Sequence, residues 1–189
     1  ATVPATIVGL AEDTRFRSMR EPVEPIVYYD IGFYIWLAVR FDSAEAGAET
    51  FIDLVAPAVH EVVLNGHALD VAAVFRDSRI ALAHLHQGPN ELKVVADCAY
   101  TNTGEGLHRF VDPVDDQAYL YTQFEVPDAR RVFASFEQPD LKATFQFTVK
   151  APEGWTVISN SPTPEPQDNV WVFEPTPRIS SYITALIVG

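Results

Sequence analysis

Cysteine is nearly absent from this sequence, because Cys98 is the only one among 189 residues. A lone thiol excludes an internal disulfide, so the fold must be held together by a hydrophobic core. A reducing, cytoplasmic environment is the simpler expectation for such a chain. Cys98 follows the apolar residues 94–96, and we expect it to be a small buried side chain.

Basic residues are also scarce: 13 Lys and Arg against 26 Asp and Glu give a formal net charge of −13. A surface this acidic repels phosphate backbones and anionic lipids, so nucleic acids and membranes are poor candidates for partners. The longest apolar run, residues 26–39, is shorter than the ~20 residues of a membrane-spanning helix, and it contains Asp30. The first residues lack a basic leader followed by an apolar run, so we expect no signal peptide.

Glycine is outnumbered by proline, nine to 14, and several prolines lie close together between residues 152 and 177. This composition favours one loop-rich, mainly β domain over a helical bundle. Alternation of apolar and polar residues predicts strands at 50–56, 60–66, 79–82, 91–97, 117–125, 142–149, 155–159, 169–173 and 179–188. Asn65-Gly66 predicts a tight turn, and Pro127-Asp128 predicts the start of a short helix.

Residues 26–39 break the alternation, because they are apolar on both faces of the expected strand. Such a strand is either enclosed between two layers or leaves one face as an exposed interface. In the second case the domain would bind a protein partner or a second copy of itself. The candidate interface residues are Tyr28, Tyr29, Phe33, Tyr34, Ile35 and Trp36.

The usual catalytic motifs are missing. His60-Glu61 begins a near match to His-Glu-x-x-His, but Leu64 stands where the second histidine would be. His84 and His86 would share one face of a strand, yet no third ligand is near them in the sequence. The chain has no Gly-x-Ser-x-Gly motif, and Cys98 has no histidine close to it in the sequence. We therefore expect no catalytic residue and no metal site in this chain.

The region around residues 101–162 carries a more specific signal. It contains Thr122-Gln123-Phe124-Glu125 and Ala129-Arg130, followed by Phe133, Phe136, Glu137, Gln138 and Pro139. This stretch resembles the N-terminal domain of the aminopeptidase N family of zinc metallopeptidases, which has Tyr-x-x-Thr-Gln-x-Glu before Ala-Arg-x-x-Phe-x-x-Phe-Asp-Glu-Pro. The resemblance extends from about residue 41 to residue 189.

The resemblance implies a fold and a role. The family's first domain is a saddle-like β-sandwich of mixed and antiparallel sheets, packed on a thermolysin-like catalytic domain. By resemblance, Glu125 would bind the free α-amine of a peptide substrate, and Gln123 would line the pocket for its first side chain. Alternation along a strand would place these two on one face, with Thr122, Phe124 and Val126 on the other.

The family's zinc ligands are absent from this sequence, as is its Gly-x-Met-x-Asn loop. We therefore expect an isolated, non-catalytic N-terminal domain without a cofactor, the zinc belonging to a catalytic domain that this chain lacks. Residues 1–40 depart from the family's pattern. An alternative is thus an engineered binding or self-associating module, built on the same β scaffold through residues 26–39, with His67, His84 and His86 as further altered positions.

Overall fold

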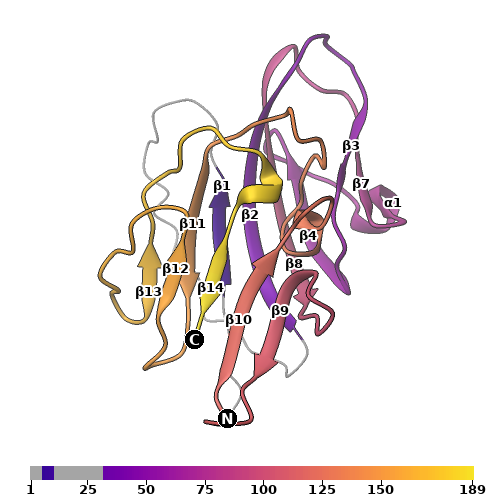
Figure 1. The fold of residues 1–189 in the computed structure, drawn as a ribbon. Coiled ribbons are helices and arrows are strands. Elements are labelled where there is room, and N and C mark those ends of the chain that lie inside the picture. Colours follow the sequence, from indigo (N-terminus) through magenta and orange to yellow (C-terminus); the bar gives the residue numbers. More distant parts are fainter. Residues whose placement is uncertain (1–5, 11–31) are drawn as a thin grey trace.

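The computed structural model describes residues 6–10 and 32–189, and the strands within these ranges form three sheets (Figure 1). The largest sheet has seven strands in the order β13-β11-β1-β2-β8-β4-β5. Strand β1 pairs parallel with β2 and antiparallel with β11, so this sheet is mixed. The strands are β1 (Thr6–Leu10), β2 (Gly32–Ser43), β4 (Ala58–Leu64), β5 (His67–Ala68), β8 (Gly88–Ala99), β11 (Phe145–Lys150) and β13 (Val170–Val172).

The long antiparallel pair β2–β8 lies near the middle of this sheet, in register from Gly32 opposite Ala99 to Ser43 opposite Gly88. The two strands bury the same face. Alternate residues of β2, from Phe33 to Val39, belong to the core, and Cys98 on β8 is buried as predicted. Burial raises the pKa of the Cys98 thiol, with the nearby Asp97 carboxylate as a smaller cause. The thiol is therefore an inert core group.

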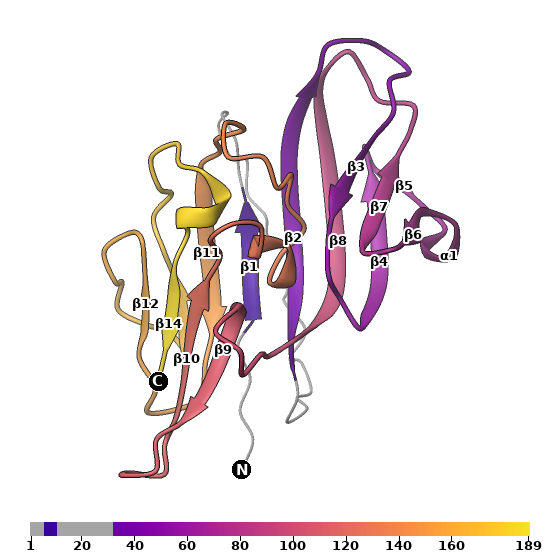
Figure 2. The same ribbon diagram turned by 45° about the vertical axis from the view of Figure 1, so that its right-hand side comes forward.

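The second sheet has four strands in the order β12-β14-β10-β9. These are β9 (Gly106–Val111), β10 (Ala118–Gln123), β12 (Val157–Ser159) and β14 (Leu186–Val188). Figure 2 shows this sheet beside the half of the large sheet that contains β11 and β1. Its inward side chains, which include Leu120, Leu186 and Val188, are buried. The arrangement is a β-sandwich, as expected for a mainly β chain of mixed and antiparallel sheets.

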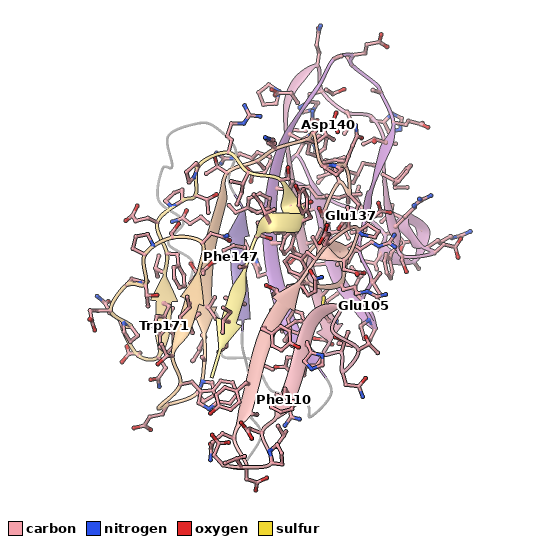
Figure 3. The ribbon with its side chains drawn as sticks, viewed as in Figure 1. Glu105, Phe110, Glu137, Asp140, Phe147 and Trp171 are labelled. Atoms are coloured by element: carbon pink, nitrogen blue, oxygen red, sulfur yellow. The ribbon has the colours of Figure 1, made fainter. Side chains whose placement is uncertain are left out.

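Phe133 is the central aromatic side chain of the core. Its ring centroid lies 5.7 Å from that of Phe124, 5.9 Å from that of Phe145 and 6.3 Å from that of Phe147. Phe145 and Phe147 are on β11 of the large sheet, whereas Phe124 directly follows β10 of the four-stranded sheet. Figure 3 labels Phe147 among the other side chains. Phe133 therefore joins the two layers.

The third sheet has three strands in the order β3-β7-β6, with β3 (Thr50–Asp53), β6 (Phe75–Arg76) and β7 (Arg79–Leu82). A single-turn helix, α1 (Val71–Val74), precedes β6, and the Asp70 carboxylate caps it by accepting a hydrogen bond from the backbone N–H of Ala72. None of the helices in the described ranges is long and apolar enough to cross a bilayer.

Residues 124–139, the linking segment, contact all three sheets. Asp53 of β3 and Ser135 exchange two backbone hydrogen bonds of 3.0 and 2.9 Å, and the backbone N–H of Val55 donates to the carbonyl of Arg130 at 2.7 Å. The ring of Phe136 meets that of Phe41 on β2 with centroids 5.3 Å apart. The linking segment therefore has its backbone fixed at several points.

Most of the expected strands are present, and Arg79–Leu82 agrees at both ends. The Asn65-Gly66 turn is confirmed: both residues have positive φ, of 52° and 79°, and they connect β4 to β5. The prediction for residues 179–188 was wrong in its first half, where the 3-10 helix η2 (Ser181–Ile183) replaces a strand. The helix predicted at Pro127-Asp128 is the three-residue 3-10 helix η1 (Ala129–Arg131).

Candidate functional site

The candidate site lies where β10 ends, at Gln123, and the chain turns through residues 125–128. Glu125 is therefore in the turn and not in the strand, which corrects the strand predicted for 117–125. Gln123 and Glu125 are both exposed, whereas Phe124 between them is buried. Val126 was expected to share a strand face with Phe124, and this was wrong, because the turn leaves Val126 exposed while Phe124 is buried.

A hydrogen bond joins the two candidate residues. The side-chain carbonyl of Gln123 accepts from the backbone N–H of Glu125 at 3.0 Å. The buried Phe124 ring packs edge-on against Phe133, and this contact anchors the turn to the core. The carboxylate of Glu125 makes no ion pair with a residue in the described ranges. The arrangement presents an unneutralised carboxylate on a fixed turn next to a side-chain amide.

His108 and Tyr121 extend this exposed face along the sheet. They are directly opposite each other on β9 and β10, with ring centroids 4.8 Å apart. The Nδ1 atom of His108 accepts a hydrogen bond from the backbone N–H of Gly104 at 2.9 Å. This contact leaves Nε2 as the ring nitrogen that is available to another partner. Sequence reasoning missed His108, because only the β9–β10 register places it beside Tyr121.

The same outer face of the four-stranded sheet carries apolar side chains that are open to solvent. Ile158, Ile187 and Tyr121 lie side by side on β12, β14 and β10, with exposures of 47%, 48% and 41%. Tyr119 and Phe110 form the next cross-strand pair. Figure 3 shows Phe110 and Glu105 at opposite ends of β9. This apolar row, defined as Phe110, Tyr119, Tyr121, Ile158 and Ile187, ends next to Gln123.

The other histidines lie apart from this site. His60 is on β4, where its Nε2 is 2.8 Å from a carboxylate oxygen of Asp97. His67, His84 and His86 are exposed. In the described ranges, no group of three or more His, Cys, Asp or Glu side chains is arranged to hold a metal ion.

The predicted interface residues divide into three groups. Tyr28 and Tyr29 lie outside the described residues. Phe33 and Ile35 are in the core of this chain, 3% and 0% exposed, so they cannot form an interface while the sheet is intact. Tyr34 and Trp36 are half-buried on the opposite face of β2, where Tyr34 stacks on His60 and Trp36 lies under the Lys93 ammonium. The interface role of these two stays a prediction.

A half-buried acid in the linking segment was also missed. Glu137 accepts a hydrogen bond from the backbone N–H of Arg130, while its other carboxylate oxygen and the Arg130 Nε are buried without a hydrogen-bond partner among the described residues. Burial raises the pKa of Glu137, and the Arg130 hydrogen bond and charge oppose that rise. The sequence placed Glu137 in a motif but gave no sign of this environment.

Comparison with known proteins identifies the family of this domain. The family described as Peptidase M1 N-terminal domain matches residues 59–183. An aminopeptidase N of Streptomyces lividans is 87% identical over 151 residues, which is 80% of this chain and 18% of that protein. An aminopeptidase N of Acetobacter pasteurianus is 33% identical over 87% of this chain and 54% of its own length. A probable M1 family aminopeptidase of Encephalitozoon cuniculi is 34% identical over 56% of this chain and 12% of its own length.

The chain thus spans about a fifth to a half of the length of the first two relatives. The family match covers β4 to η2, and so includes Gln123, Glu125 and the linking segment. The mainly β architecture and the sequence match agree. The chain therefore belongs to the Peptidase M1 N-terminal domain family, as the N-terminal domain of an M1 aminopeptidase N.

Proposed function

We propose that this domain binds the free α-amine of a peptide substrate for a zinc aminopeptidase, and that it has no peptidase activity of its own. The observation that carries the proposal is the exposed, unneutralised Glu125 carboxylate, held on a turn by the Gln123 side chain. The fold positions this turn, because β10 ends at Gln123 and the Phe124 ring packs in the core.

The chemistry favours an amino terminus over an internal peptide bond. An ammonium donates up to three charge-assisted hydrogen bonds to a carboxylate, whereas an internal amide has no cation to offer. Gln123 adds an amide NH₂ donor beside the carboxylate, because its carbonyl is already used by the Glu125 backbone. Glu125 would thus select the substrate end, and Gln123 would contact the part of the substrate next to it.

Zinc chemistry belongs to another part of the enzyme in this proposal. The described residues offer no group that fits a zinc ion, so no step of hydrolysis is assigned to them. The chain spans only part of its relatives' length, and their remaining residues would supply the metal site. The apolar row beside Gln123 would then be the surface that the catalytic part covers, because a substrate held by Glu125 must also reach the metal.

Substitution in the complete aminopeptidase that carries this domain tests the amine contact. We expect Glu125→Gln to raise KM for an aminoacyl substrate about tenfold or more, the usual cost of a charge-assisted hydrogen bond. The variant should also lose the preference for that substrate over its des-amino analogue. Glu153→Gln, at an exposed turn, is the control. Unchanged KM and unchanged preference in Glu125→Gln would exclude the proposal.

An assay of the isolated chain tests whether the domain has peptidase activity of its own. We expect no turnover of an aminoacyl chromogenic substrate after zinc is added. Turnover that persists through repurification and disappears with a chelator would show that the chain is itself an enzyme.

A further inference from the structure

Arg131 connects the turn that carries Glu125 to the loop before β9. Its Nε lies 2.6 Å from a carboxylate oxygen of Asp128, at the end of the 125–128 turn, and its Nη2 lies 3.1 Å from a carboxylate oxygen of Glu105. The backbone N–H of Asp128 donates to the carbonyl of Phe124 at 3.1 Å, which closes the turn around Glu125. Asp128 is therefore held by its backbone N–H within the turn and by its carboxylate at Arg131.

The aliphatic part of Arg131 makes a second contact, against Gly106. A Cβ atom at Gly106 would lie 2.8 Å from the Cβ of Arg131, closer than carbon atoms pack. Gly106 is also the residue directly opposite Gln123 in the β9–β10 pairing. Arg131 thus lies against the backbone position that pairs with Gln123, while its guanidinium holds the turn that carries Glu125.

The loop before β9 is itself anchored, so it can serve as a fixed support. The Gly104 N–H donates to His108, and the Thr101 hydroxyl donates to the Glu105 carbonyl. The backbone N–H of Thr101 donates to the Leu107 carbonyl at 3.0 Å. Glu105 is therefore a pairing partner whose own backbone is held in place.

We propose that Arg131 is a positioning residue for the substrate amine, which sets the distance and direction of Glu125 relative to Gln123. The inference rests on the proposed function of Glu125. Arg131 and its two acidic partners are partly exposed, and ion pairs of this kind add little to global stability. Their effect on the geometry of the turn is larger, because a charge-assisted contact depends on a short distance to the ammonium.

The test uses the complete aminopeptidase with Arg131→Ala, alone and combined with Glu125→Gln. We expect Arg131→Ala to raise KM for an aminoacyl substrate about threefold or more, within the range found for coupled neighbours, and to leave kcat nearly unchanged. In the Glu125→Gln background it should raise KM no further. Arg76→Ala, an exposed arginine on β6, is the control for loss of a surface charge.

Each outcome bears on the inference. If Glu125→Gln raises KM and Arg131→Ala does not, the positioning role is wrong and the proposed function stands. If Arg131→Ala raises KM equally in both backgrounds, it acts independently of Glu125 and the inference is again wrong. If Glu125→Gln leaves KM unchanged, both the proposed function and this inference are wrong. Should Arg131→Ala fail to fold, Glu105→Gln and Asp128→Asn each remove one ion pair and must give the same pattern.

Discussion

The carboxylate of Glu137 accepts a hydrogen bond from the backbone N–H of Arg130, with Oε1 and N 2.5 Å apart. Burial nevertheless raises the pKa of Glu137 above its ordinary value. For an acid with a raised pKa in the folded state, the unfolded chain releases its proton first as the pH rises. The stability linked to this group is thus complete below the unfolded pKa of about 4.3 and is lost as the pH rises through the folded pKa.

Glu137→Gln should flatten this dependence. Glutamine keeps an acceptor for the Arg130 N–H but does not titrate. We expect the free energy of unfolding of the wild type, relative to Glu137→Gln, to fall as the pH rises from acidic values toward neutrality. Urea unfolding of both proteins across that range measures the difference, with Glu153→Gln as the exposed control. A difference that does not change with pH would contradict the raised pKa.

Phe133→Ala should be one of the most damaging single substitutions. Its side chain is 1% exposed and touches three phenylalanine rings from two layers. Phenylalanine-to-alanine changes in cores cost about 3 to 5 kcal/mol of unfolding free energy. Phe110→Ala, at a 44% exposed position on β9, removes the same atoms without opening a core cavity. Denaturant unfolding should separate the two variants clearly, and equal losses would contradict the layer-joining role of Phe133.

Gly106→Ala and Gly104→Ala form a matched pair for the Arg131 contact. Both glycines have positive φ, of 63° and 86°, so alanine strains the backbone in each. Only at Gly106 does the new Cβ meet the Arg131 side chain, whereas no atom lies within 4 Å of it at Gly104. We expect Gly106→Ala to lower the midpoint of thermal unfolding more than Gly104→Ala. The reverse order would show that Arg131 does not pack on Gly106.

The apolar row leads to a prediction for the complete enzyme. A charge at Ile187, in the middle of the row, should weaken docking of the catalytic part, because an unpaired carboxylate would be buried there. Ile187→Asp should therefore lower the thermal midpoint of the complete enzyme more than that of the isolated domain. Val172→Asp, at a 55% exposed position on β13, is the control. Equal shifts for Ile187→Asp in the two proteins would mean that the row is not an interdomain surface.

Local chemistry explains which parts of the fold could be predicted. The Asn65-Gly66 turn and strand β7 follow from residue types that favour one backbone conformation. Strand β9 was missed because it begins at Gly106, whose role is set by a distant contact with Arg131. Residues 179–188 look like one strand locally, but η2 interrupts them.

The candidate site, like the fold, could be predicted only in part from the local sequence. The motif indicated Gln123 and Glu125 as candidate residues, and strand alternation placed them on one face with Phe124 on the other; in the structure both are exposed and Phe124 is buried. It could not predict that the strand ends at Gln123, because the turn is closed by hydrogen bonds and by Arg131. His108, Arg131 and the Glu137–Arg130 pair depend on pairing between segments, for which a single sequence carries no direct signal.

The linking segment has a consequence for the entropy of binding. Glu125 lies on a stretch whose backbone is hydrogen bonded to β3 and whose aromatic rings pack on β2 and β11. The conformational freedom of this stretch is therefore lost when the domain folds and not when a ligand arrives. Under the proposed function, an incoming ammonium would meet a preorganised acceptor, so a larger part of the contact energy would remain available for affinity. The same core that stabilises the domain would thereby make a single exposed carboxylate an effective anchor for a flexible peptide end.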